Sequence, residues 1–219
     1  MSKIIAIMLL LCCGMMLFAC ADDNGRRKAE QQKTIVVTDS VGRKVELPYP
    51  LERVAVCNVY NAELITAVGA IDKIVGVDNY IFKDQSGFKN RFNEAQVFGI
   101  SQNAMNYEKL AELSPQAVII TGEGTWRDAQ EMLDRFGIKV IVINSYYTDQ
   151  FADNCRLIGR IFGREEQAEE LVNYFNDKLA YIQKQLQGVP RRSLYFEYRT
   201  LGKTAVPGDY FYKMVEYSG

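Results

Sequence analysis

Five short apolar runs alternate with amphipathic segments in the middle of the chain. Each is rich in valine and isoleucine, and they occupy residues 53–57, 73–77, 97–100, 117–122 and 138–144. Nearly continuous apolar runs of this length are typical of strands that are covered on both faces. Because strands that alternate with helices form parallel sheets with helices on both faces, the pattern predicts an α/β fold.

The segments between these runs carry helix signals. Asn61 and Asn106 precede stretches of helical periodicity, and we expect them to cap helices over residues 62–70 and 107–113. Residues 125–136 form a further amphipathic stretch. Each predicted helix therefore lies between two predicted strands, as a crossover connection requires.

A different pattern flanks this region on both sides. Two β-rich runs around residues 39–43 predict a hairpin. After residue 148, two helical stretches are separated by Gly163, and the second is about 35 Å long, which suits a strut between two lobes. Residues 192–199 predict one more strand.

We therefore expect a signal peptide (1–19), a tether (20–33), an N-terminal α/β lobe (34–148), an inter-lobe helical segment (149–188) and the beginning of a second lobe (189–219).

The first residues have the layout of a secretory signal peptide. Lys3 precedes an apolar run over residues 4–18, and Ala19 and Cys20 are followed by a charged stretch. The run of about fifteen residues is short for a membrane span of about twenty, although a transmembrane anchor is the alternative. The tetrapeptide LFAC at 17–20 resembles a bacterial lipobox. This resemblance implies a lipid on the Cys20 thiol, membrane anchoring and an extracytoplasmic location.

Composition narrows the possible chemistry. The 219 residues include no histidine, which excludes histidine-based triads and histidine-ligated zinc or haem. A formal net charge of −1 argues against nucleic acid as a partner. Cys57 and Cys155 could form a disulfide, but we prefer two buried free thiols. We expect no resident metal or cofactor.

Several blocks of the chain follow one another in a recognisable order. TIVVTDSVGRKVELPYPLERVAVCN contains Pro48, Arg53 and Val54 in a P-x-x-x-x-R-V arrangement, and NAELITAVGAIDKIVGVD, MNYEKLAELSPQAVI and RFGIKVIVI follow. This order resembles the substrate-binding proteins of ABC importers for siderophores, haem and cobalamin. The similarity extends over about residues 34–219.

The resemblance implies a function and a partner. Proteins of this family trap a ligand between two lobes and deliver it to a permease, so we expect a metal chelate such as a ferric siderophore, haem or a corrinoid. Glu108, in MNYEKLAEL, occupies the place of a glutamate that docks onto the permease. The family's second lobe is longer than residues 189–219, so the resemblance also implies an incomplete C-terminal lobe.

Candidate ligand-binding residues lie where the predicted strands end. In open parallel sheets, ligands bind beyond the carboxyl ends of the strands. Four of the five ends carry a tyrosine or tryptophan close by, and aromatic walls suit a bulky, partly apolar ligand. The candidates are Asn58, Tyr60, Tyr80, Trp126, Tyr146, Tyr147 and, from the last predicted strand, Tyr198 and Arg199.

Three other functions are weaker hypotheses. A molybdate-like oxyanion would need more basic groups than Arg127 and Arg199, although helix N-termini can also bind anions. An enzyme is disfavoured because Arg127 replaces the third glycine of a nucleotide fingerprint after residues 122–124, and because no histidine can activate Cys57. A purely structural surface lipoprotein is the third alternative.

Overall fold

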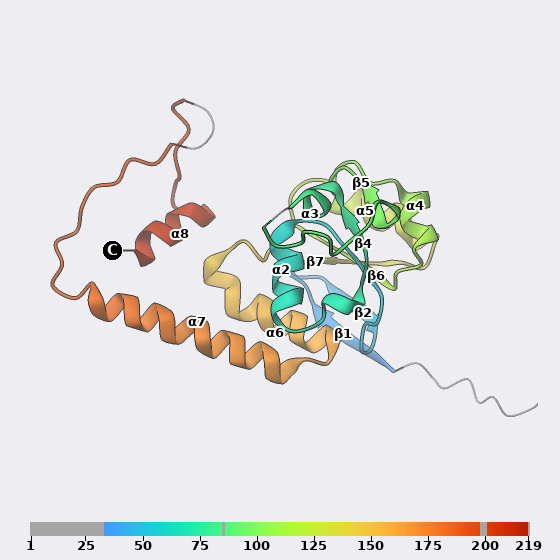
Figure 1. Cartoon of the computed structure of the whole chain (residues 1–219), viewed down its shortest axis with the longest axis horizontal. Coiled ribbons are helices and arrows are strands. Elements are labelled where there is room, and N and C mark those ends of the chain that lie inside the picture. The colour runs from blue at the N-terminus through green and yellow to red at the C-terminus, as the bar shows by residue number, and fades with distance from the viewer. Residues whose placement is uncertain (1–32, 85, 198–200, 219) are drawn as a thin grey trace, which may run out of the picture. The chain divides into compact units, whose positions relative to one another are not determined.

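The computed structural model describes residues 33–84, 86–197 and 201–218 (Figure 1). The predicted signal peptide, the lipobox with Cys20, and the candidates Tyr198 and Arg199 lie outside the described residues.

Five parallel strands form the central sheet, in the order β5-β4-β3-β6-β7. Each strand falls within or overlaps one of the five apolar runs, so the predicted parallel sheet is confirmed. The bounds are Val54–Val56 for β3, Ile74–Asp78 for β4, Val97–Gly99 for β5, Ala117–Ile120 for β6 and Lys139–Val142 for β7.

Helices cover both faces of this sheet (Figure 1). The predicted α/β class is therefore confirmed. The α-helices are α2 (Val59–Ala67), α3 (Asn79–Lys83), α4 (Tyr107–Glu112), α5 (Trp126–Asp134), α6 (Phe151–Phe162), α7 (Glu165–Gln185) and α8 (Tyr210–Tyr217), and short 3₁₀ turns occupy η1 (Ile71–Lys73), η2 (Glu94–Gln96) and η3 (Thr148–Gln150).

Alternate residues of the strands supply two separate cores. Val54 and Val56 of β3 belong to a cluster that includes buried residues of α2, α6 and α7. Ala55, between them, belongs to a second cluster with residues of α4 and α5. Since successive side chains of a strand point to opposite faces, one strand serves both cores. This double burial explains why the strands are apolar at nearly every position.

Helices α6 and α7 pack closely where a side chain is missing. A Cβ atom on Gly159 would lie 2.5 Å from the Cβ of Ala168, so only glycine permits this approach. Ala168 and Val172 are buried, whereas Tyr174 and Tyr181 farther along α7 are exposed.

In the described part of the chain, no helix combines the length and apolarity needed to cross a membrane.

Two details of the predicted secondary structure are wrong. Helix α2 begins at Val59 with Asn58 as its N-cap, while Asn61 is a buried residue within the helix. Residues 192–196 form no strand, and Glu197 makes only an isolated antiparallel bridge with Thr204. A strand needs a continuous ladder with a neighbour to pair its backbone groups, and the described residues provide only this single bridge.

The hairpin of β1 (Thr34–Thr38) and β2 (Lys44–Pro48) is joined to the sheet through Asp39. The Asp39 carboxylate, fully buried, accepts hydrogen bonds from the backbone N–H groups of Arg43 (2.9 Å) and Val142 (3.3 Å). It also pairs with the Arg43 guanidinium at 2.6 Å. Arg43 in turn donates to the Val140 carbonyl at 3.0 Å and to Gln130. One carboxylate thus fixes the hairpin turn to β7.

Replacing Asp39 with alanine should destabilise the protein by about 3 kcal/mol, because the partly buried Arg43 guanidinium and the buried Val142 N–H both lose a buried carboxylate partner. Urea unfolding would measure the change in the free energy of unfolding. Asp72→Ala is the matched control, since Asp72 forms an exposed ion pair with Lys73 at 3.2 Å and its loss should cost less than about 1 kcal/mol. Equal effects of the two substitutions would contradict this role of Asp39.

Candidate ligand-binding site

A pocket of about 940 Å³ lies at the carboxyl edge of the sheet. It is bordered by the chain segments that follow β3, β4, β5 and β6. Its volume falls within the range of about 300–1,000 Å³ that is typical of small-molecule sites. The residues that line it are Asn58, Val59, Tyr60, Glu63, Asp78, Asn79, Tyr80, Lys83, Asp84, Ser86, Ser101, Gln102, Asn103, Thr121 and Glu123.

Asn58 shapes the turn between β3 and α2. Its φ of 77° lies in the left-handed region, which asparagine tolerates better than most residues. Its side-chain oxygen accepts the Tyr60 N–H at 3.0 Å and thereby caps α2. The Tyr60 side chain, directly after this turn, is 49% exposed at the pocket. The predicted site residues Asn58 and Tyr60 are therefore brought together by one local motif.

Asp78 connects two of the loops that border the pocket. Its carboxylate accepts the backbone N–H of Asn58 at 3.0 Å and that of Ile81 at 2.9 Å, so it joins the end of β3 to the start of α3. Burial raises the pKa of this carboxyl, although its hydrogen bonds from backbone N–H groups act in the opposite direction. The neighbouring Tyr80, a predicted site residue, is 63% exposed.

Gln102 connects the loops after β5 and β6. Its side-chain oxygen accepts hydrogen bonds from the Thr121 backbone N–H (2.9 Å) and hydroxyl (2.8 Å), and its amide N–H donates to the Glu123 carbonyl. Next to it, Asn103 accepts from the Thr125 hydroxyl at 3.1 Å and lies against Gly124. These amides fix the far wall of the pocket.

Tyr146 and Tyr147 lie beside the pocket lining. The Tyr146 hydroxyl donates to the Glu123 carboxylate at 3.2 Å, and the Tyr146 and Tyr60 ring centroids are 6.5 Å apart. The Tyr147 ring packs against the Tyr146 ring in a tilted arrangement, with a centroid separation of 4.6 Å. Burial, and then the Glu123 carboxylate, raise the pKa of Tyr146. The free phenol is therefore protonated at neutral pH.

Trp126 does not line the pocket. It is 9% exposed and packs in the second core cluster. The guanidinium groups of Arg43 and Arg127 lie over its ring, at 4.3 Å and 4.1 Å from the centroid. Trp126 follows the end of β6, as the sequence indicated. However, it is the first residue of the amphipathic helix α5, and its side chain packs into the core.

Three of the fifteen lining residues, Asn58, Tyr60 and Tyr80, were sequence candidates, and twelve were not. Four of the missed residues lie beyond the strand ends: Glu63, Lys83, Asp84 and Ser86. They come from α2, from the short helix α3 and from the turn that follows α3. The Asp84 carboxylate accepts hydrogen bonds from the Ser86 N–H (3.0 Å) and hydroxyl (2.6 Å). The sequence DQSG at 84–87 is a turn signal that could have indicated this part of the site.

The two cysteines of the described chain are free and buried, as the preferred interpretation of the sequence states. Burial raises the pKa of Cys57 well above its usual value, and the Asp78 carboxylate adds to this effect. The thiol is therefore a poor nucleophile. Within the described residues, no group of three or more histidine, cysteine, aspartate or glutamate side chains could hold a metal ion.

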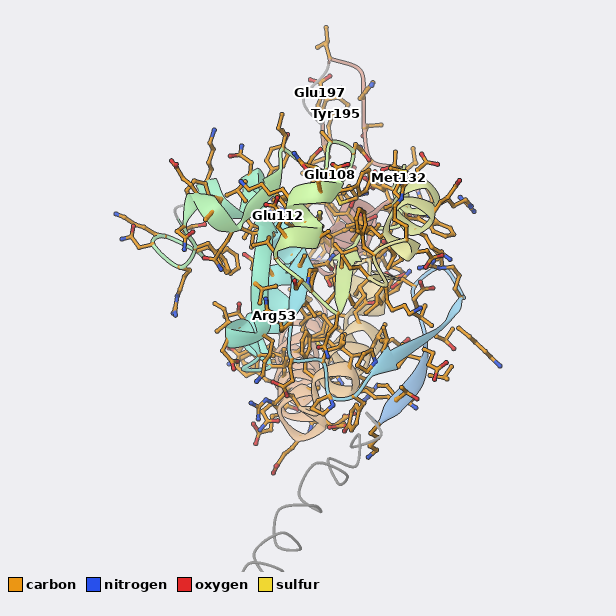
Figure 2. The ribbon with its side chains drawn as sticks, turned by 90° about the vertical axis from the view of Figure 1, so that its right-hand side faces the viewer. Arg53, Glu108, Glu112, Met132, Tyr195 and Glu197 are labelled. Carbon is orange, nitrogen blue, oxygen red and sulfur yellow. The ribbon has the colours of Figure 1, made fainter. Side chains whose placement is uncertain are left out.

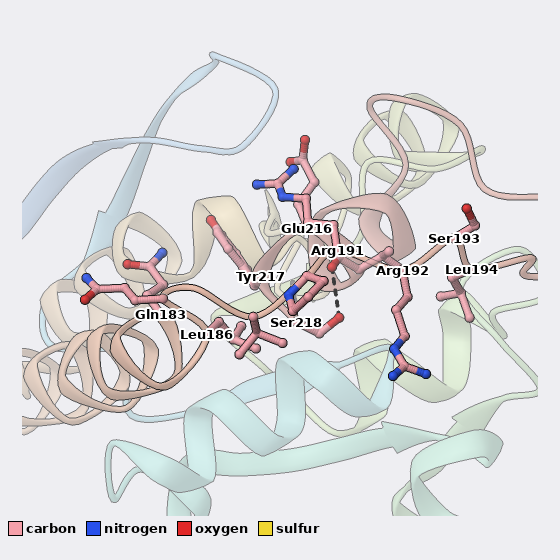
Figure 3. A pocket seen from close by; sticks show the side chains of 13 residues that line it. Gln183, Leu186, Arg191, Arg192, Ser193, Leu194, Glu216, Tyr217 and Ser218 are labelled. Atoms are coloured by element: carbon pink, nitrogen blue, oxygen red, sulfur yellow. Dashed lines mark hydrogen bonds between the residues drawn. The ribbon is translucent and has the colours of Figure 1, made fainter.

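A second pocket, of about 700 Å³, is lined by no residue of the sheet, and Figure 3 shows the side chains that line it. Its walls are the end of α7, residues 189–194 and the end of α8. Residues 189–194 belong to no helix or strand, and Leu194 is 64% exposed. Because this pocket has no part of the sheet edge in its lining, we assign no function to it.

A family model of periplasmic binding proteins matches residues 54–213. The chain belongs to the periplasmic binding protein family. This membership implies a location outside the cytoplasm. No curated protein matches the chain.

Solved structures of periplasmic binding proteins share this fold. A periplasmic solute binding protein from Veillonella parvula is 28% identical, with a TM-score of 0.59, and the match covers 72% of this chain and 50% of that one. The heme binding protein HmuT is 18% identical (TM-score 0.56; 74% and 52% covered). The siderophore binding protein BauB, solved with acinetobactin and ferric iron, is 21% identical (0.55; 73% and 57%).

These comparisons define what kind of protein this is. The family and its structural neighbours are solute-binding proteins and not enzymes. The chain spans about half the length of the solved proteins that it matches. The resemblance found in the sequence is thus confirmed at the level of family and fold.

The Asp78 carboxyl should titrate above the ordinary aspartate value of about 3.9. Between that value and its higher folded pKa, the native state binds more protons than the unfolded state, so the contribution of Asp78 to stability falls as pH rises through this window. Carboxyl ¹³C NMR would measure the midpoint. A midpoint for Asp78 at or below the ordinary aspartate value of about 3.9 would contradict the effect of burial.

Proposed function

We propose that the protein is an extracytoplasmic solute-binding lipoprotein that delivers a metal chelate to an ABC importer. The observation that carries this proposal is the pocket of about 940 Å³ at the carboxyl edge of the sheet, in a chain of this family. A ferric siderophore, haem or a corrinoid is the class of ligand that we propose. Neighbours of the same fold that bind heme or a ferric siderophore support this choice.

The lining suits such a ligand chemically. The rings of Tyr60 and Tyr80 offer flat apolar surfaces with polar tips. Short amides and hydroxyls, including Asn79, Ser101 and Asn103, add hydrogen-bonding groups between the rings. A large organic chelate presents both apolar and hydrogen-bonding surface, whereas a small ion would leave most of this pocket unfilled.

Replacing Tyr60 or Tyr80 with alanine should weaken chelate binding about three- to tenfold each, because an aromatic contact is lost. Titration calorimetry with a panel of ferric siderophores, haemin and cobalamin would measure the dissociation constants. Tyr174→Ala is the control, since Tyr174 is 62% exposed on α7, outside the pocket lining. If Tyr174→Ala weakened binding as much as the other two, or if no chelate bound, the proposed site would be wrong.

We also propose that Glu108 contacts the permease. Glu108 is exposed in the first turn of α4, and Glu112 follows one helical turn later (Figure 2). Arg53 holds the other end of α4, because its guanidinium donates to the carbonyls of Leu113 (2.6 Å) and Ser114 (3.1 Å). Glu108 is not among the residues that line the pocket. Its carboxylate is therefore available to a partner without disturbing the ligand.

Glu108→Ala should leave chelate affinity unchanged and reduce uptake of the chelate by cells, since a desolvated docking pair is lost. Glu131→Ala is the matched control, because Glu131 is also an exposed acid but lies on α5. Uptake of the labelled chelate would be compared at equal protein levels. Normal uptake by the Glu108 variant would show that Glu108 does not dock onto the permease. If that variant also had a lower melting temperature, the role of Glu108 would be to stabilise the helix alone.

The lipid anchor is a proposal from the sequence alone, since Cys20 lies outside the described residues. Two or more acyl chains give stable attachment to a membrane. Growth with a labelled fatty acid should label the wild-type protein and Cys13→Ala, but not Cys20→Ala. Equal labelling of all three would rule out lipidation at Cys20.

A further inference from the structure

The pocket at the sheet edge is rich in carboxylates. Among the described residues that line it, Lys83 is the one cation, and the acids are Glu63, Asp78, Asp84 and Glu123. The chain as a whole has a formal net charge of only −1, so this excess is local. The acids lie on different loops and helices that meet at the pocket, and not on one exposed helix face.

Hydrogen bonds position two of these carboxylates without neutralising them. Asp84 accepts from Ser86 and from the Gly87 N–H (3.3 Å), and Glu123 accepts from the Tyr146 hydroxyl (3.2 Å). None of the ion pairs in the described ranges involves an acid of the pocket. Their negative charge is therefore available to a ligand.

The pKa shifts of Asp84 and Glu63 agree with a pocket that holds negative charge. Hydrogen bonds from Ser86 lower the pKa of Asp84, so this group is ionised at neutral pH. Desolvation and the Asp84 carboxylate raise the pKa of Glu63, as expected where like charges share a space. Asp78 is buried and supports the loops, so it is excluded from direct selection of the ligand.

We propose that Glu63, Asp84 and Glu123 select the charge of the ligand, and that the pocket accepts neutral or cationic chelates and rejects multiply anionic ones. This inference rests on the proposed function. A cleft lined by charges of one sign raises the local concentration of the opposite sign, and like charges brought together cost several kcal/mol. The exposed rings of Tyr60 and Tyr80 can add cation–π attraction for a positive group. The same charges oppose a small oxyanion.

Three ferric chelates test this proposal on the whole chain: ferrioxamine B, which is cationic; ferrichrome, which is neutral; and ferric enterobactin, which is multiply anionic. Wild type should bind the first two more tightly than the third. In the triple variant Glu63→Gln, Asp84→Asn and Glu123→Gln, affinity for the cationic chelate should fall about two- to fivefold for each charge removed, and affinity for the anionic chelate should rise by a similar factor. Both changes should shrink at high salt.

The control removes three exposed acids that do not line this pocket, by Glu112→Gln, Glu131→Gln and Asp134→Asn. It should leave the order of the three affinities unchanged. Each single variant is measured as well, with its melting temperature, so that a folding defect in the triple variant does not hide the effect. Tightest binding of the anionic chelate, or equal shifts in control and triple variants, would overturn charge selection while the proposed function stood. Binding of no chelate of any charge would overturn both.

Discussion

The five strands of the sheet run in one direction, and the position of the site depends on this constraint. Parallel strands bring all their carboxyl ends, and the loops that follow, to the same edge. The loops there carry backbone groups that no ladder pairs, and these need other partners. Side chains provide them: Asp78 bridges the ends of β3 and β4, Gln102 bridges the loops after β5 and β6, and Asn144 accepts the Gly122 N–H at 2.7 Å.

These bridges divide the residues at the edge into two groups. Residues such as Asp78 and Gln102 are used internally, to hold one loop against the next. Residues such as Tyr60 and Tyr80 stand on the loops that are held, and their rings remain exposed. Fixing the loops before a ligand arrives reduces the entropy that binding would cost. A solute-binding protein needs this combination of a rigid base and accessible rings.

The sequence predicted the sheet and most of its helices because double burial leaves an unmistakable apolar pattern in the strands. It misplaced the start of α2, because Asn58 caps the helix from a left-handed conformation that the extended N-cap rule does not anticipate. It placed Trp126 at the site by proximity alone, and the amphipathic turn of α5 buries that ring. It missed Lys83 and Asp84, because helix α3 is too short to show a period. It missed Glu63, because only residues close to the strand ends were considered as candidates, and Glu63 lies inside α2.

The proposed ligand binds at the sheet edge and not in the pocket between the ends of α7 and α8. Backbone amide shifts of the ¹⁵N-labelled chain, titrated with the diamagnetic gallium analogue of a bound ferric chelate, test it most directly. Binding at the sheet edge should give the largest shifts at Asn58, Tyr80 and Asn103, which line the edge pocket. Shifts confined to Leu186, Leu194 and Tyr217, which line the other pocket, would contradict it.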